Sequence, residues 1–161
     1  MISRSLNSRR VHWRNALAMA AALMAASAGA MACTSGGQST GQSSRAALRA
    51  ARWVLVDVGG RPVVGDAEHR PYIEFAPDSA RFSGSTGCNR LTGPFTFTGT
   101  TIHFGTAATT RMACLDAAVD AQEQAVLSAL SEADGYQIAR DTLNLVRGAV
   151  TLARFAAAPR R

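Results

Sequence analysis

The sequence predicts an α+β domain, mostly antiparallel β, in which a small, partly closed, barrel-like sheet has one helix packed on it. Three observations lead to this fold class. Short runs of β-branched and aromatic residues alternate with polar ones and are separated by turns rich in Gly and Pro. A single stretch, 117–132, has the composition and apolar spacing of a helix. Because a single helix pattern interrupts the strands, the order favours an antiparallel domain over βαβ winding, which needs a helix between successive strands.

The predicted elements begin at residue 52, where a stretch rich in Ser, Gly and Gln gives way to strand-forming residues. A first strand over 53–56 ends in the turn at 59–62. Asp116 is the expected N-cap of the helix, and the Asp134-Gly135 pair is expected to end it. The other predicted strands are 72–75, 81–84, 94–98, 101–104, 136–139, 143–146 and 150–155.

The apolar members of these strands form the predicted interior, because successive side chains of a strand point to opposite faces. This interior is either an ordinary packed core or the lining of a ligand cavity. The predicted interior residues are Trp53, Leu55, Phe75, Phe82, Phe97, Ile102, Phe104, Leu143, Leu145 and Leu152.

The N-terminal region has the pattern of an export signal. Residues 1–15 are polar and basic, and residues 16–32 form an uncharged run of mostly small apolar residues. This arrangement predicts a secretory signal peptide over 1–32, which does not belong to the fold. The rest of the chain then divides into a linker over 33–51, the domain over 52–157 and a C-terminal tail over 158–161.

The end of the signal resembles a bacterial lipobox. Ala30-Met31-Ala32 places small residues before Cys33, which we expect to receive a diacylglyceryl group with palmitate-type acyl chains. The polar residues that follow predict a flexible tether. Thr34 follows the cysteine in place of Asp, which favours the outer membrane, facing the periplasm. Simple secretion after ordinary signal cleavage is the alternative, and a retained, uncleaved anchor is a second one.

The charge distribution argues against a nucleic-acid partner. The chain has 17 Arg and no Lys, with a formal net charge of +6. Four of these Arg lie before the apolar run, so the part after Cys33 has 13 Arg against 11 acidic residues. A nucleic-acid binder concentrates basic charge on one face. Here the arginines of the predicted strands and turns are spaced singly, as are Arg61, Arg70, Arg81, Arg90 and Arg111.

No residue pattern predicts a catalytic, cofactor or metal site. The two histidines after the signal, His69 and His103, have no zinc-ligand spacing to each other or to the cysteines. His103 alternates with apolar neighbours and should face away from the interior. Ser85 is not in a G-x-S-x-G motif, and Cys88 has no base that sequence can place beside it. We therefore expect no enzyme activity, with an unrecognised hydrolase as the alternative.

Two short motifs resemble those of the META domain family. Gly87-Cys88-Asn89-Arg90, followed by Gly93, is similar to its G-C-N-R-x-x-G signature. The segment Thr110-Arg111-Met112-Ala113-Cys114 is similar to its T-x-M-A-C segment, which precedes the helix. The order of the surrounding elements also agrees, and it places Glu123 in the helix.

The resemblance implies a small antiparallel, barrel-like domain of the lipoprotein type, related to the heat-shock-inducible HslJ group that is associated with novobiocin resistance. It implies no catalytic residues. We expect a non-catalytic envelope lipoprotein that binds a protein partner or an apolar ligand in envelope stress tolerance. The alternative is a secreted, soluble inhibitor or carrier domain.

The first motif has its own physical interpretation. Gly84, Gly87 and Gly93 are expected to adopt positive φ in a tight crossing between strands. Asn89 is expected to cap backbone groups of that turn through its side-chain amide. Lipidation of Cys33 would leave Cys88 and Cys114 as a natural pair, and export favours a disulfide between them. Two buried free thiols remain the alternative.

Overall fold

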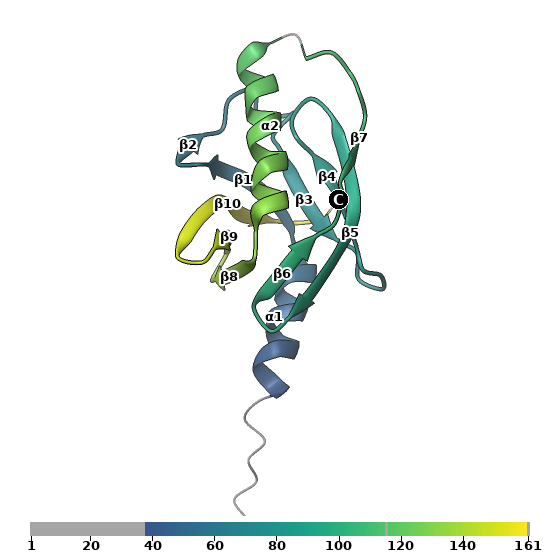
Figure 1. The fold of residues 1–161 in the computed structure, drawn as a ribbon, viewed down its shortest axis with the longest axis vertical. Helices are drawn as coiled ribbons and strands as arrows, with labels where there is room; N and C mark the ends of the chain where they lie inside the picture. The colour runs from purple at the N-terminus through teal and green to yellow at the C-terminus, as the bar shows by residue number, and fades with distance from the viewer. Residues whose placement is uncertain (1–37, 115, 161) are drawn as a thin grey trace, which may run out of the picture. The chain divides into compact units, whose positions relative to one another are not determined.

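The structure is a computed structural model that describes residues 38–114 and 116–160, with side chains from residue 43 onward. The expected signal peptide and Cys33 lie outside the described residues. Within these ranges the chain forms a mostly antiparallel β-sheet with two helices (Figure 1). The elements are α1 (Gln38–Ala50), β1 (Arg52–Val58), β2 (Arg61–Pro62), β3 (Tyr72–Phe75), β4 (Arg81–Ser85), β5 (Arg90–Thr98), β6 (Thr101–Phe104), β7 (Ala108–Thr109), α2 (Ala117–Glu132), β8 (Gly135–Ala139), β9 (Thr142–Arg147) and β10 (Val150–Ala158).

The sheet closes into a barrel, whereas the sequence predicted only partial closure. Its strand order is β10-β9-β8-β6-β5-β4-β3-β1-β2, and β10 also pairs with β1. Closure depends on the length of β10, which continues to Ala158, beyond its predicted end at 155 and into the expected tail. Its last residues pair along β1, from Arg52 with Ala158 to Val58 with Ala153.

The barrel interior is filled by side chains. Seven of the predicted interior residues are buried, and Phe97, Phe104 and Leu152 are partly buried at its margin. The rings of Phe75 and Phe95 lie 4.9 Å apart, edge to face, as do those of Phe82 and Phe104 at 5.1 Å. Such aromatic pairs stabilise a core beyond their buried area. This packing supports an ordinary core.

Helix α1 occupies part of the stretch that was predicted to be a flexible linker. Leu48, near its end, is fully buried, and its carbonyl accepts a hydrogen bond of 2.8 Å from Nε1 of Trp53. The Arg45 guanidinium lies 4.4 Å from the centre of the Phe97 ring. The polar composition suggested a tether, but tertiary packing of the Leu48 side chain and of the Arg45 stem decides the structure of this short helix.

Helix α2 has the predicted bounds and begins as predicted. The Asp116 side chain accepts a hydrogen bond of 2.7 Å from the backbone N–H of Ala118, which is the arrangement of an N-cap. The side of α2 that faces the sheet contains Gln122, Glu123, Val126, Ala129 and Leu130. Neither helix among the described residues is long and apolar enough to cross a membrane.

Two of the three glycines that were predicted to adopt positive φ, Gly84 and Gly93, are required for a different structural reason. Gly87 has a φ of +102°, as expected for a turn. Gly84 and Gly93, however, lie inside β4 and β5 and are not among the residues with positive φ. A Cβ on Gly84 would lie 2.0 Å from the Tyr72 carbonyl oxygen, and one on Gly93 would lie 2.7 Å from the Phe82 ring. These positions require glycine because neighbouring atoms occupy the space of a side chain.

Replacing Gly84 with alanine is therefore expected to lower the free energy of unfolding by at least about 2 kcal/mol, because the methyl group displaces the β3 backbone. Urea denaturation of the full chain measures the change. Ser83→Ala, at the adjacent exposed position of β4, is the matched control and should stay within about 0.5 kcal/mol of the wild type. Equal stability of Gly84→Ala and the control would contradict the steric argument.

Candidate functional site

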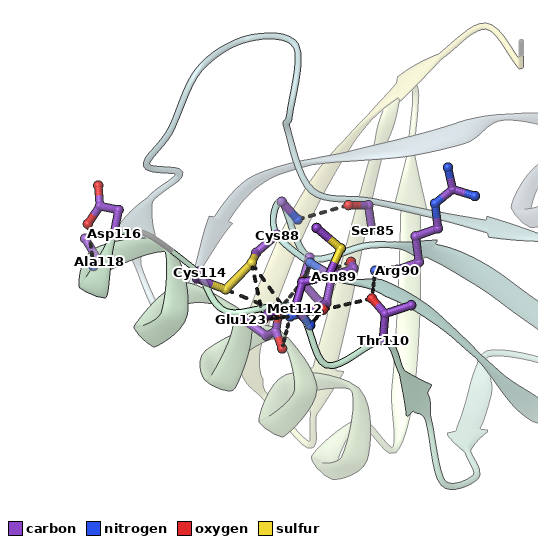
Figure 2. Close-up of a disulfide and its surroundings, with 12 residues drawn as sticks. Ser85, Cys88, Asn89, Arg90, Thr110, Met112, Cys114, Asp116, Ala118 and Glu123 are labelled. Carbon is purple, nitrogen blue, oxygen red and sulfur yellow. Dashed lines mark hydrogen bonds between the residues drawn. A yellow bond between two sulfur atoms is a disulfide. The ribbon is translucent and has the colours of Figure 1, made fainter.

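The two family-like motifs meet at the disulfide. Cys88 follows β4, Cys114 precedes α2, and the structure joins them with a Cα–Cα distance of 5.8 Å (Figure 2). This is the pairing that the cysteine count favoured over free thiols. We call residues 105–114 the strap. It contains β7, which pairs with β5, and the disulfide fixes its far end.

Asn89 connects the motifs behind the disulfide. Its side chain is almost fully buried, with 3% exposed. Its Oδ1 accepts hydrogen bonds from the backbone N–H of Met112 at 2.9 Å and from Oγ1 of Thr110 at 2.8 Å. Its Nδ2 donates to both carboxylate oxygens of Glu123, at 2.9 and 3.1 Å. Asn89 therefore holds the strap and α2 together, whereas the sequence predicted that it would cap its own turn.

Thr86 caps that turn instead. Its backbone N–H donates to the Asn89 carbonyl at 2.8 Å, and its Oγ1 accepts from the Asn89 N–H at 3.0 Å. The same Oγ1 donates to Oε2 of Glu123 at 2.5 Å. Thr86 is completely buried, and Glu123 has only 6% of its surface exposed. The family resemblance placed Glu123 in the helix but gave no sign of this contact.

The buried cluster of Thr86, Asn89 and Glu123 has a structural role beside the disulfide. Sulfur atoms of Cys88 and Cys114 and an oxygen of Glu123 lie within 4.8 Å of one another. In the disulfide form the two sulfurs are bonded to each other, so this set lacks the thiolates that zinc prefers. The carboxylate accepts hydrogen bonds from Thr86 and Asn89, which satisfies a buried charge that would otherwise be costly. The cluster therefore fixes the positions of three segments.

The outer face of the barrel in front of this cluster has two rows of cross-strand neighbours. One row contains Val54, Tyr72, Ser85 and Arg90, and the other contains Arg52, Glu74, Ser83 and Thr92. The Arg52 guanidinium lies 4.2 Å from the centre of the Tyr72 ring, and its Nε lies 2.7 Å from the Glu74 carboxylate. The Tyr72 side chain thus stands in the middle of a polar surface.

Two open pockets flank Tyr72 on this face, and both include it in their lining. The first has a volume of about 560 Å³ and the second of about 680 Å³. The first pocket is lined by Tyr72, Ser83, Gly84, Arg90, Leu91, Thr92, Ala108, Thr109 and Thr110. The second pocket is lined by Arg52, Val54, Ala67, Glu68, Arg70, Tyr72, Ala158 and Pro159. Both volumes are in the range of small-molecule sites.

The motifs and the first pocket are physically connected. The Arg90 backbone N–H donates to Oγ1 of Thr110 at 3.1 Å, and the Thr110 N–H donates to the Arg90 carbonyl at 3.0 Å. Both residues line the first pocket. Arg90 follows Asn89 in the sequence, and the Thr110 hydroxyl donates a hydrogen bond to the Asn89 side chain. The buried cluster thus holds the strap in the position where it forms one wall of the pocket.

The META domain profile matches residues 46–159, which is most of the chain. The chain belongs to the META domain family. The match begins inside α1, whereas the sequence placed the start of the domain at residue 52.

Solved structures with a similar fold support the assignment. A protein solved by NMR is 27% identical, with a TM-score of 0.56, and the match covers 68% of this chain and 92% of that one. A Burkholderia xenovorans protein, also solved by NMR, is 26% identical, with a TM-score of 0.58 and coverage of 73% and 88%. A DUF4847 family protein from Bacteroides vulgatus, 19% identical with a TM-score of 0.50 and coverage of 71% and 96%, shares the fold. The comparison with curated proteins gave no match.

The loop before β3 forms part of the second pocket of this META domain and is fixed by polar contacts. Asp66 accepts hydrogen bonds from the backbone N–H groups of His69 at 2.8 Å and Glu68 at 3.0 Å. The backbone bond from His69, followed by the bond from its ring, holds the pKa of Asp66 below its ordinary value. The Gln122 side chain accepts a bond of 2.9 Å from the Val64 N–H, which attaches the loop to α2.

The structure separates the other chemistry-bearing residues. His69 contacts Asp66 in the loop, while His103 lies on the exposed side of β6, as its alternation predicted. Ser85 accepts a bond of 3.1 Å from the Gly87 N–H. Burial raises the pKa of the Tyr136 phenol, which donates to the Gly99 carbonyl at 3.0 Å inside the META domain. These groups lie on different elements and serve local structure.

The side chains of Met112 and Ala113, in the second motif, do not pack into the core of the domain. Met112 has 63% of its surface exposed, and Ala113 is exposed as well. The contribution of Met112 to the cluster comes from its backbone, because its N–H and carbonyl bond the Asn89 side chain at 2.9 and 3.3 Å. The contacts among the described residues therefore do not explain why position 112 is a methionine.

Proposed function

We propose that this META domain is a non-catalytic binding module of a lipid-anchored protein of the cell envelope, and that its outer face binds another envelope component. The observation that carries the proposal is the pair of pockets that share Tyr72. They lie on a rigid barrel wall and are supported by the disulfide and by the buried cluster of Thr86, Asn89 and Glu123.

Several features support a binding role over catalysis. The sulfur of Cys88 is bonded to Cys114 and is not a nucleophile in this form. Glu123 is buried behind its hydrogen-bond donors, where a substrate has no access to it. Across the described parts of the chain, His69 and His103 are not hydrogen-bonded to a serine or cysteine. An adjacent general base is one of the common ways in which a serine or cysteine nucleophile is activated.

The location of the pockets favours a polar partner over an apolar ligand inside the barrel. Aromatic rings fill the interior around Phe75 and Phe82. The outer face presents Tyr72 beside arginines, and these residue types dominate binding energy in protein interfaces. A partner would therefore contact the surface of the barrel wall.

The anchor in this proposal is Cys33, which precedes Gln38, the first residue of α1, by five positions. A tether of this length keeps the domain within a short distance of the bilayer, since an extended chain spans about 3.3–3.6 Å per residue. Thr34 favours retention in the outer membrane, with the domain facing the periplasm.

Mass spectrometry of the mature protein tests the anchor. We expect the chain to lack residues 1–32 and to carry an N-terminal diacylglyceryl-cysteine, and we expect Cys33→Ala to abolish membrane association. An unmodified N-terminus near Cys33 would instead support the secreted form and contradict the anchor.

Crosslinking in the intact envelope tests the binding role separately. We expect a specific partner band from the wild type that is lost in Tyr72→Ala and retained in Arg61→Gln, since Arg61 is exposed on β2 away from both pockets. Identical crosslinking of both variants would contradict binding at the outer face.

A further inference from the structure

We propose that the first pocket binds an acidic sugar, with the sugar carboxylate at Arg90. This inference rests on the proposed function and gives the chemical class of the envelope component that occupies the pocket. It follows from the charge of the pocket, from its uncommitted hydroxyl groups and from the pairing of the strands that form its floor.

The Arg90 side chain supplies a cation without a counter-ion. Within the described residues it takes part in no side-chain hydrogen bond or ion pair, and Figure 2 shows it directed away from the disulfide and Glu123. No acidic residue lines the pocket. Glu74, in the neighbouring row, is already paired with Arg52 at 2.7 Å. A guanidinium binds a carboxylate, as it does a phosphate, with two parallel hydrogen bonds.

Three hydroxyl groups in the same pocket are also uncommitted. The side-chain oxygens of Tyr72, Ser83 and Thr109 have no hydrogen-bond partner in the part of the chain that the structure describes. Thr92 and Thr110 differ, because Thr92 donates to the Phe82 carbonyl at 3.0 Å and Thr110 donates to Asn89. Each free hydroxyl can donate and accept a hydrogen bond, which suits a ligand that itself carries hydroxyl groups.

The strands below the pocket favour a sugar over a peptide. A peptide adds to a sheet through the unpaired backbone groups of an edge strand. Here β4 is paired with β3 and β5, and the first residues of β5 are paired with β4 and β7. The backbone of β4 and of the first residues of β5 is therefore bonded on both sides, and the strand of the pocket that pairs on one side alone among the described strands is the two-residue β7. Such a short edge gives a peptide little to pair with, whereas the pocket offers side-chain hydroxyls, a guanidinium and an aromatic ring. These are the groups that recognise a polyhydroxyl ligand with a negative charge.

A titration of the full-length protein in detergent micelles with a matched pair of sugars tests this proposal. N-acetylmuramic acid and N-acetylglucosamine share the same ring, but only the first carries a carboxylate. We expect the acidic sugar to bind at least about 10-fold more tightly, as a charge-assisted hydrogen bond would require. In NMR spectra, the shift changes should involve Ser83, Arg90 and Thr109.

Substitutions locate the binding. Arg90→Gln should remove the preference for the acidic sugar, and Arg61→Gln should retain it. Should Arg90→Gln fail to fold, Ser83→Asp is the second variant, and its added carboxylate should weaken binding of the acidic sugar by about 10-fold. Equal affinity for the two sugars, or unchanged affinity in either pocket variant, would overturn the proposal.

Tetraglutamate serves as the acidic-peptide probe, and tighter binding of it than of the acidic sugar would also overturn the proposal. The mass spectrometry that tests the lipid anchor and the crosslinking that tests partner binding use no sugar probe. Failure of the acidic-sugar site is therefore distinguishable from failure of the proposed envelope role.

Discussion

Replacing Glu123 with alanine is expected to lower the free energy of unfolding by about 1–3 kcal/mol, the cost of weakening the hydrogen bonds of buried polar groups. The substitution removes the shorter acceptor of the Thr86 hydroxyl and of the Asn89 amide, which are both buried, and leaves them the Asn89 and Met112 carbonyls at 3.1 and 3.3 Å. It also frees the strap from α2, because Asn89 bonds both segments.

Urea denaturation of the full chain measures this effect. Gln124→Ala is the matched control, because it lies next to Glu123 on the exposed side of α2 and should change stability by less than about 0.5 kcal/mol. Glu123→Gln should give an intermediate loss. The glutamine side chain keeps one acceptor oxygen, but it replaces the other with an NH2 group, which is a donor and cannot accept a hydrogen bond from Asn89. A loss below 1 kcal/mol (about fivefold in the folding equilibrium) for Glu123→Ala would show that the cluster is not required.

Removing the disulfide by the double substitution Cys88→Ala and Cys114→Ala is expected to lower the free energy of unfolding by about 3–4 kcal/mol. The two cysteines are 26 residues apart, and their bond restricts the unfolded chain by closing that loop. In the folded protein, loss of the bond also releases the end of the strap, so binding at the first pocket should weaken in parallel.

Denaturation of the oxidised wild type and of the double variant measures the difference, with Cys33→Ala as the control that leaves the bridge intact. Thiol counting on unfolded, unreduced protein should detect neither Cys88 nor Cys114. Two free thiols from these positions, or equal stability of the two proteins, would contradict a stabilising bridge.

Local sequence patterns were sufficient for most of the barrel and for α2. Alternation placed Trp53, Leu55 and Leu143 inside, and side-chain chemistry identified Asp116 as the N-cap. The Gly59-Gly60 turn also follows its residue types, because both glycines have positive φ. These features depend on neighbours in the sequence, which is why they could be predicted.

Features that depend on distant partners could not be predicted. The polar stretch that forms α1 gave no sign that Leu48 covers the barrel interior, and the two residues of β7 are too short for a periodic signal. Asn89 and Glu123 are 34 positions apart, and only the packing of α2 on the strap brings them into contact. The pockets depend on the register of β1, β3, β4 and β5, which alternation alone does not give.

The pairing of β1 with β10 has a consequence for the order in which this domain is made. The first strand begins at Arg52, and its partner at that position, Ala158, is synthesised about a hundred residues later. Until then one edge of β1 lacks its neighbour, and an unpaired edge is a template for aggregation. Contacts between such distant segments also slow folding. A nascent chain therefore remains prone to aggregation until its C-terminal strand has been made, and a chain that stops before Val150 lacks the strand that closes the barrel.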